Sequence, residues 1–375
     1  MKIAVLGAGM VGRAIALDLA AQYDVTSFDV NKDHLNSLKE QNNSIKTSKK
    51  DLADYKNYYT WLKPFDIVIS ALPGFMGFKA LKAVIESGKN VVDISFFAEN
   101  ALSLDSLAKE KNVTVITDCG EAPGLSNLIL GRCNEEMTVK SFACYVGGLP
   151  LERKKPFEYK APFSPVDVIE EYIRPARLME KGKIVIKPAL SEREILKVNR
   201  IGNLEAFNTD GLRSLLFTMK HIPEMKEKTL RYPGHIDLIS VLKETGFFEK
   251  KPVKIKDTEI TPLEFVSKLL SEEWKLEPEE KEFTVMKIFI TGRKNGKLKK
   301  IEYFLLDHYD EKTGTSSMAR TTGYTCAAAV NLIAEKHFTE KGVFPPELIG
   351  KNKSCYDFII NYLKERNVAL KKKEN

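Results

Sequence analysis

Short apolar segments alternate with helix-like segments through the first third of the chain. The apolar, β-prone segments predict strands at residues 2–6, 24–30, 65–71, 90–94 and 113–117. Amphipathic patterns between them predict helices at residues 10–21, 77–87 and 103–111. Strands that alternate with helices favour right-handed crossovers and a parallel sheet. We therefore predict an α/β fold whose first domain, residues 1–130, has a doubly wound parallel sheet.

The pattern changes after about Gly131. A strand is predicted at 141–148, and Pro150, Pro156, Pro162 and Pro165 then indicate a loop-rich segment. The later strands, at 183–187, 285–291 and 299–306, have an antiparallel character, since Asn295–Gly296 is a hairpin turn signal. Helical patterns at 211–218 and 235–245 lie among them. This indicates a second, α+β domain at residues 131–316, suited to substrate binding and dimerisation.

The last part of the chain returns to helical patterns. Residues 325–336 are small and apolar on most sides, which predicts a buried helix, and residues 357–365 predict an amphipathic one. We expect residues 317–375 to be C-terminal helices that pack back on the first domain.

The glycine motif GxGxxG follows the first predicted strand and opens the first predicted helix. Gly7 permits a tight turn, Gly9 lets the backbone approach a pyrophosphate, and Gly12 lets the helix pack closely on the strand. The helix N-terminus then faces the phosphates. This context predicts a Rossmann dinucleotide site, in which Ala8, Met10 and Val11 also take part.

The second predicted strand ends at Asp29, beside Val30. A carboxylate there can accept hydrogen bonds from ribose hydroxyls and repels a 2′-phosphate, so NAD is favoured over NADP, although Lys32 lies close by. The alternative is that Asp29 only caps a turn. The nicotinamide half is expected to lie against residues that follow later strands, namely Ala71, Leu72, Pro73, Ser95 and Gly120.

Composition narrows the class of protein. The 375 residues are 43% hydrophobic and 29% charged, and no run of about 18 apolar residues predicts a membrane span. The five cysteines form no CxxC pair, which predicts neither a metal site nor a disulfide framework and favours a reduced, cytoplasmic setting. The net charge is +7, but 58 basic and 51 acidic residues are interleaved, so we expect no nucleic-acid partner. Lys371, Lys372 and Lys373 are interpreted as a solvated tail.

Several segments resemble one known family. They are 118–127 (DCGEAPGLSN), 145–150 (YVGGLP), 170–176 (EEYIRPA), 204–212 (LEAFNTDGL), 229–235 (TLRYPGH) and 318–324 (MARTTGY). Together they resemble the saccharopine dehydrogenase-like group and, within it, the lysine 6-dehydrogenases. The resemblance implies NAD-dependent oxidative deamination of L-lysine at its ε-carbon. The products would be the 6-semialdehyde, which cyclises to piperideine-6-carboxylate, together with NADH and ammonia.

The chain also departs from the patterns of that group. Ala122 stands where saccharopine reductases have an acid, and Thr209-Asp210-Gly211 replaces their Asn-Arg-Asp segment, which argues against saccharopine as substrate. Glu121 stands where a neutral residue is expected. A saccharopine or carboxynorspermidine-type dehydrogenase therefore remains the alternative within enzymes. A non-catalytic NAD-binding regulator is the alternative outside them.

The chemistry asks for a base and for a group that binds a carboxylate. The ε-amine has a pKa near 10.4 and must lose a proton before hydride can leave. The candidate bases are Glu121 and Asp93, each of which has a cap or structural hydrogen bond as its alternative role. Cys119 is interpreted as a packed residue, because amine oxidation needs no thiol step.

The α-carboxylate suits the planar fork of an arginine. The candidates are Arg174, Arg213 and Arg231, for which ion pairing is the alternative. The family-like segments add Tyr172, Thr209 and His235 as substrate-binding candidates, and for His235 a structural role is the stronger alternative. A homodimer is expected by analogy with the family.

Overall fold

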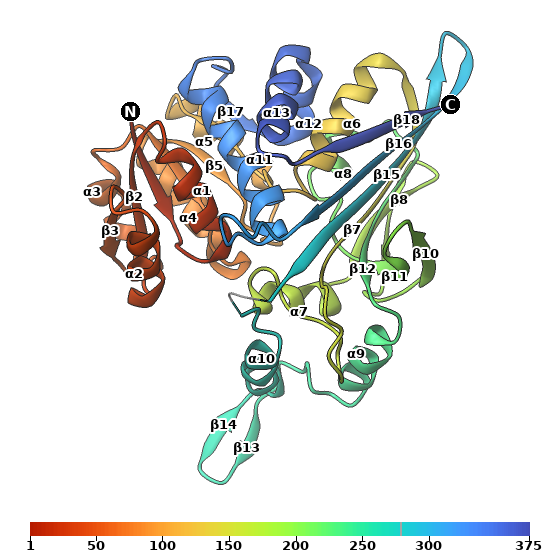
Figure 1. Ribbon diagram of the computed structural model, residues 1–375, viewed down its shortest axis with the longest axis horizontal. Coiled ribbons are helices and arrows are strands. Elements are labelled where there is room, and N and C mark those ends of the chain that lie inside the picture. Colours follow the sequence, from red (N-terminus) through yellow and green to blue (C-terminus); the bar gives the residue numbers. More distant parts are fainter. Residues whose placement is uncertain (278–279) are drawn as a thin grey trace.

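The chain folds around two large sheets, seen side by side in Figure 1. The computed structural model describes residues 1–277 and 280–375. Within those residues the first sheet has seven strands, in the order β17-β6-β5-β4-β1-β2-β3, and all neighbours pair in parallel. Its strands are β1 (Lys2–Leu6), β2 (Asp24–Asp29), β3 (Lys46–Lys49), β4 (Ile67–Ser70), β5 (Asn90–Asp93), β6 (Thr114–Ile116) and β17 (Gly342–Phe344).

Helices cover both faces of this sheet, as the alternating pattern predicts. Apolar residues of the strands are buried on both sides and form two core clusters, one on each face. The helices of this part are α1 (Met10–Leu19), α2 (Lys32–Gln41), α3 (Tyr58–Leu62), α4 (Gly74–Glu86) and α5 (Asp105–Glu110), with 3₁₀ turns at Tyr55–Asn57 and Ala101–Leu104. The predicted Rossmann domain with its parallel sheet is confirmed.

The second sheet is mixed. Its main path within the described chain is β10-β11-β12-β7-β15-β16-β18, where β12 and β7 are parallel and the other neighbours are antiparallel, while β8 and β9 extend it beside β12. Its strands are β7 (Thr138–Pro150), β8 (Ala176–Glu180), β9 (Lys183–Lys187), β10 (Glu194–Val198), β11 (Gly202–Asn208), β12 (Glu224–Arg231), β15 (Glu282–Lys294), β16 (Lys297–His308) and β18 (Leu370–Glu374). The predicted hairpin turn is present, with positive φ at Asn295 and Gly296.

The helices of the second part lie between and below the sheets. They are α6 (Leu125–Glu136), α7 (Pro165–Ile173), α8 (Leu215–Thr218), α9 (His235–Glu244) and α10 (Pro262–Glu273). The short hairpin of β13 (Val253–Ile255) and β14 (Thr258–Ile260) projects from the body at the bottom of Figure 1. Helix α7 occupies the segment interpreted as loop, because Pro165 stands at its first turn, where proline is tolerated. The helix predicted at 211–218 shrinks to α8.

Residues 317–334 and strand β17 of the C-terminal segment pack on the first sheet, as expected, whereas residues 346–351 pack mainly on α6. Helix α11 (Ser317–Ala334) contacts α1, β4 and β5, and it starts eight residues before the predicted helix. It is followed by β17, α12 (Pro346–Lys351) and α13 (Lys353–Glu365). Small side chains on α11 allow the close approach, since Gly323 faces Ala14 and Ile15 of α1.

The last residues of the chain differ from the predicted solvated tail. Lys371–Lys373 are not a solvated tail, since they form part of strand β18, which pairs with β16 at the edge of the second sheet. The side chains stay exposed while the backbone adds to the ladder. Residues 370–374 therefore belong with the second domain and not with the helices that return to the first.

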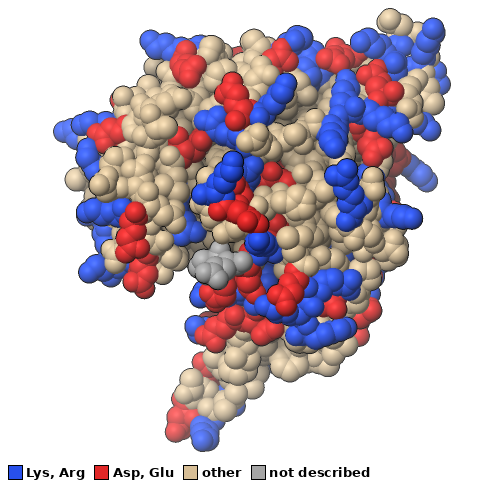
Figure 2. Space-filling view, in the orientation of Figure 1, with Lys and Arg blue, Asp and Glu red and all other residues tan. Residues whose placement is uncertain are grey.

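The surface shows no single-sign field in the view of Figure 2. Basic and acidic side chains are interleaved over that face. No helix in the described part of the chain is long and apolar enough to cross a membrane.

Candidate functional site

A cavity of about 800 Å³ runs from the glycine turn of the first sheet to the face of the second sheet. Its first wall is formed by the carboxyl ends of the parallel strands, where open α/β sheets bind ligands. Its second wall comes from α7, β7, β12 and α11. The cavity therefore joins a nucleotide region to a region that both domains build.

The glycine motif forms the floor of the nucleotide region. Gly7 has φ +101°, and an added Cβ there would lie 2.3 Å from the Ala71 carbonyl oxygen. A Cβ at Gly12 would lie 2.1 Å from the Gly7 carbonyl oxygen. A Cβ at Gly9, in contrast, meets no atom within 4 Å and would stand in open space at the start of α1. This open place at a helix N-terminus fits a pyrophosphate.

Asp29 closes the adenosine end. Its carboxylate accepts hydrogen bonds of 2.7 Å from the backbone amides of Ala8 and Asn31, and it lies 3.5 Å from His34 Nδ1. Burial acts to raise the pKa of Asp29, but these hydrogen bonds outweigh it and hold the pKa below its ordinary value. The side chain is thus held as a carboxylate at the edge of the cavity.

Twelve of the thirteen predicted cofactor-binding residues line the cavity. They are Gly7, Gly9, Met10, Val11, Gly12, Asp29, Val30, Ala71, Leu72, Pro73, Ser95 and Gly120. Ala8 is the exception, since its backbone amide instead fixes Asp29.

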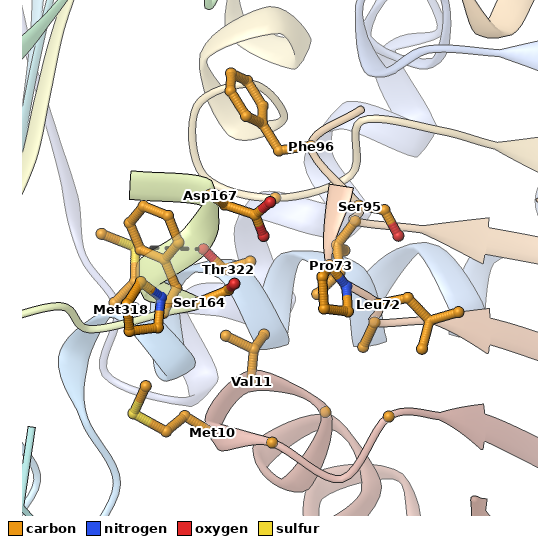
Figure 3. A pocket seen from close by; sticks show the side chains of 18 of the residues that line it. Met10, Val11, Leu72, Pro73, Ser95, Phe96, Ser164, Asp167, Met318 and Thr322 are labelled. Atoms are coloured by element: carbon orange, nitrogen blue, oxygen red, sulfur yellow. Dashed lines mark hydrogen bonds between the residues drawn. The ribbon is translucent and has the colours of Figure 1, made fainter. Parts of the chain in front are cut away.

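The second domain reaches across to the expected nicotinamide region through α7. Figure 3 shows Asp167 opposite Pro73 and Ser95. Asp167 Oδ1 accepts a hydrogen bond of 3.0 Å from the Gly74 amide at the N-terminus of α4. Burial raises the pKa of Asp167 to about 6. This contact ties the substrate domain to the loop after β4.

The far end of the cavity is acidic. Five carboxylates line it, and among the described residues Arg231 is the only arginine or lysine that does so. The five are Asp118, Glu121, Asp167, Glu171 and Glu227. Such a lining favours a substrate with more positive than negative groups.

Glu121 is one of the two predicted bases, and it lines the cavity just after the bridge residue Gly120. Its Oε2 accepts a hydrogen bond of 3.2 Å from the Thr321 hydroxyl of α11, and its Oε1 is buried with no hydrogen-bond partner in the described chain. Burial, reinforced by the charges of Asp307 and Glu282, raises the pKa of Glu121 to about 8. Near that pH the group can both take and return a proton.

Strand β12 supplies a row of polar side chains. Residues two apart on a strand point to the same face, and Glu227, Thr229 and Arg231 all line the cavity. Thr229 bonds Thr209 across 3.0 Å. Arg231 donates to Glu171 Oε2 at 2.9 Å and to the Tyr172 hydroxyl at 3.0 Å. Thr209 and Arg231 are thus the predicted substrate residues that the fold places at the cavity.

Arg213, predicted to bind substrate, lies outside the cavity lining. Its Nε donates to Asp118 Oδ1 at 2.6 Å, and its Nη1 donates to the Phe97 carbonyl oxygen. Both side chains of the ion pair are almost fully buried. Arg213 does not line the cavity, because it is used to join the second domain to the end of β6.

Tyr172, His235 and Arg174 also lie outside the cavity lining. His235 Nε2 bonds the Tyr172 hydroxyl at 3.0 Å, and Nδ1 bonds the Phe157 carbonyl oxygen at 3.0 Å. Burial and the charge of Arg231 lower the pKa of His235 to about 3. The histidine and the tyrosine thus support Arg231 from behind. Arg174 lies over the Phe96 ring, with its guanidinium carbon 5.0 Å from the centroid.

Asp93, the other predicted base, is fully buried and does not line the cavity. Burial raises the pKa of Asp93 to about 7, although the hydroxyls of Ser70 and Ser95 act to lower it. Ser95, whose hydroxyl acts on this carboxyl, does line the cavity. Cys119 is buried as expected, and its sulfur lies 3.8 Å from the Thr325 carbonyl oxygen.

Four of the five acids at the far end were not among the predicted site residues, and Asp118 is one of them. Asp167 and Glu171 lie on a helix interpreted as loop, and Glu227 lies on a strand that the pattern did not predict. The alternation Glu227-Thr229-Arg231 is the signal that could have identified the last one. The described residues hold no cluster of three or more histidine, cysteine or acidic side chains placed to bind a metal ion.

Comparisons with known proteins agree with this architecture. Residues 3–116 match the family described as "Saccharopine dehydrogenase NADP binding domain", and residues 120–368 match "Saccharopine dehydrogenase C-terminal domain". A solved structure of apo saccharopine dehydrogenase (L-Glu forming) from Saccharomyces cerevisiae superimposes with a TM-score of 0.79, covering 100% of this chain and 99% of that one at 22% identity. This likeness concerns the fold.

Curated relatives point the same way. The saccharopine dehydrogenase [NADP(+), L-glutamate-forming] of Saccharomyces cerevisiae is 26% identical over 264 residues, which is 66% of this chain and 58% of that protein. The α-aminoadipic semialdehyde synthase of Arabidopsis thaliana is 26% identical over 223 residues, which is 56% of this chain. The match covers only 21% of that synthase, so the chain spans well under two thirds of these relatives.

Proposed function

Because the chain belongs to the saccharopine dehydrogenase family of oxidoreductases, we propose that it oxidises the carbon–nitrogen bond of a basic amino acid. The specific reaction proposed is the NAD-dependent deamination of L-lysine at the ε-carbon. Its products are the 6-semialdehyde, NADH and ammonia.

The acidic lining of the far end of the cavity carries this proposal. Five carboxylates face the substrate region, against the single guanidinium of Arg231. Lysine brings two amines and one carboxylate, which matches this balance. Saccharopine brings additional carboxylates from its glutamate portion, and the lining offers no second arginine or lysine among the described residues to pair with them.

The choice of NAD rests on Asp29. A 2′-phosphate would meet an ionised carboxylate that two amides hold in place, and the repulsion would be strong. The family description and the yeast relative both name NADP. A substitution of Asp29 therefore tests whether this chain prefers NAD instead. Asp29→Ser should narrow the ratio of kcat/KM for NAD over NADP. An unchanged ratio, or a wild type that prefers NADP, would show that Asp29 does not set a preference for NAD.

The chain's own residues then divide the work. When bound, the nicotinamide accepts a hydride from the carbon that bears the amine. Glu121 takes the proton that the ammonium must lose. After hydride transfer it takes a proton from the water that attacks the iminium carbon and replaces ammonia. Arg231, held by Tyr172 and Glu171, binds the α-carboxylate. Asp167 of α7 bonds the Gly74 amide and joins the two walls of the site.

The alternative is a saccharopine-type dehydrogenase, which the names of the relatives favour. One assay separates the two. Purified protein is mixed with NAD or NADP and with L-lysine or saccharopine at alkaline pH, and NADH or NADPH, ammonia and glutamate are measured. Equal amounts of NADH and ammonia from lysine support the proposal. Glutamate from saccharopine, with no lysine activity, would establish the alternative.

A further inference from the structure

Four of the five carboxylates at the substrate end have partners within the protein. Two are in ion pairs, and two accept hydrogen bonds from neutral donors. The contacts are Asp118 with Arg213 at 2.6 Å, Glu171 with Arg231 at 2.9 Å, Asp167 with the Gly74 amide at 3.0 Å and Glu121 with the Thr321 hydroxyl at 3.2 Å. These contacts account for the positions of the four side chains.

Glu227 is different. Its side chain faces the cavity and is 4% exposed, yet within residues 1–277 and 280–375 its carboxylate has neither a hydrogen bond nor an ion pair. Burial, reinforced by the charges of Glu171 and Asp210, raises the pKa of Glu227 to about 8, while Arg213 acts to lower it. Burying a carboxylate without a partner costs free energy in a folded protein. A cationic ligand that pairs with Glu227 would offset this cost.

The surrounding backbone makes space for this side chain. A Cβ at Gly211 would lie 1.6 Å from Glu227 Oε1. The carboxylate therefore rests against a residue that has no side chain of its own. Any other residue at position 211 would displace Glu227 from the cavity.

Glu227 also has a fixed place relative to Arg231. They are four positions apart on the strand, so their Cα atoms are about 13 Å apart along the same face of β12. The two side chains reach into one cavity with Thr229 between them, and above about pH 8, where Glu227 is ionised, they carry opposite charges. An extended amino acid with a carboxylate at one end and an amine at the other can lie along this row. Glu121, whose pKa is raised in part by Glu227, faces the amine end.

We propose that Glu227 binds the reacting ammonium group of the substrate, while Arg231 holds the α-carboxylate at the other end of the row. This rests on the proposed function and deepens it, since it names the residue that selects an amine-bearing side chain. Glu227 holds the ammonium in place, and Glu121 removes its proton.

The test compares two ligands that differ at one end. L-lysine and L-norleucine share the α-amino and α-carboxylate groups, but norleucine has a methyl group in place of the ε-amine. Binding of each to the full-length protein saturated with NADH is measured by calorimetry at about pH 9, above the pKa of Glu227 and below that of the ε-ammonium, and this needs no turnover. The wild type should bind lysine at least about 10-fold more tightly than norleucine, because one charge-assisted contact is lost with the methyl group.

Glu227→Gln keeps the shape and removes the charge. It should weaken lysine binding about 10- to 100-fold and leave norleucine and NADH binding unchanged. The matched control is Glu224→Gln on the exposed end of the same strand, which should change neither affinity.

Equal losses for lysine and norleucine in Glu227→Gln, or no loss for lysine, would overturn the inference. So would a wild type that binds the two ligands equally, and that result needs no variant. A wild type that neither binds nor oxidises lysine would instead overturn the proposed function. Lysine oxidation with an unaffected Glu227→Gln variant would overturn only the role of Glu227.

Discussion

At the scale of single residues, Gly9 and Gly12 have different roles within one motif. The Cβ position at Gly12 is occupied by the Gly7 carbonyl, whereas the Cβ position at Gly9 is open. A side chain at 12 therefore disturbs the protein itself, and a side chain at 9 disturbs only what binds there.

This separation gives a clean prediction for cofactor binding. Gly9→Val should fold with nearly wild-type Tm but lose NADH affinity by about 100-fold or more, since a bulky group fills the approach to the pyrophosphate. Gly12→Ala should lower Tm, because its methyl group overlaps a backbone oxygen. Thermal unfolding and NADH fluorescence titration measure both effects. A well-folded Gly9→Val protein that binds NADH normally would contradict the assigned site.

The pKa of Glu121, the proposed base, also affects stability. Its folded pKa of about 8 lies above the value of about 4.3 expected in an unfolded chain. Between those values the folded protein keeps a proton that the unfolded chain releases. The free energy of unfolding therefore falls as the pH rises from about 4.3 to about 8.

Glu121→Gln should remove this loss of stability together with the base. We expect the Tm gain of the variant over the wild type to be larger at pH 9 than at pH 5. We also expect kcat to fall about 10²- to 10⁴-fold, with loss of the alkaline rise in rate. Tm and rate profiles from pH 5 to 10 measure this. A variant that keeps the pH dependence of the wild-type rate would assign the base elsewhere.

At the scale of elements, α11 is central to the first domain although it comes some 300 residues after the glycine motif. It contacts α1, β4 and β5, and its residue Thr321 holds Glu121. Asn331 of the same helix accepts a hydrogen bond of 2.7 Å from Tyr23. The nucleotide domain is therefore incomplete without it.

Truncation at two points separates the C-terminal elements. Ending the chain at residue 316 removes α11 and β17, which exposes the apolar face of the first sheet, and should yield an aggregating protein without NADH affinity. Ending it at residue 369 removes only β18 and should preserve NADH binding. Solubility and fluorescence titration compare the two truncations. A soluble, NADH-binding fragment of residues 1–130 would show that the first domain stands alone.

At the scale of the whole molecule, the site depends on how the two domains are held together. The buried pair of Arg213 and Asp118 crosses between them, and the Asp167–Gly74 hydrogen bond is a second crossing contact. These contacts set the distance between the nucleotide region and the row on β12.

Breaking the buried Arg213–Asp118 pair should therefore lower the free energy of unfolding and also change how the two domains are placed relative to each other. Arg213→Gln leaves Asp118 buried without its charge partner, and the free energy of unfolding should fall by about 3–5 kcal/mol. Lys353→Gln, which breaks an exposed helix pair with Asp357, should change it by less than about 1 kcal/mol. Urea denaturation measures both. Equal effects of the two variants would mean that the buried pair does not hold the domains.

The sequence by itself determined the glycine turn and five of the seven strands of the nucleotide half, but not the edge strands β3 and β17. A strand, a glycine turn and a helix are local in the chain, and their periodicity and spacing predict both the parallel sheet and the residues that line the cofactor region. The family-like segments also contain Glu121, Thr209 and Arg231, which line the cavity.

Only the tertiary structure decided which charged residues meet the substrate region. Arg174, Arg213 and Arg231 look equivalent in the sequence, yet one lies over Phe96, one holds Asp118 and one lines the cavity. The partners of a buried charged group come from distant parts of the chain, and their positions decide whether the group lines the cavity, as the paired Arg231 does, or lies behind it, as Arg213 does. The place of Glu227 followed from the opposite case, because its carboxylate faces the cavity with no partner in the described chain.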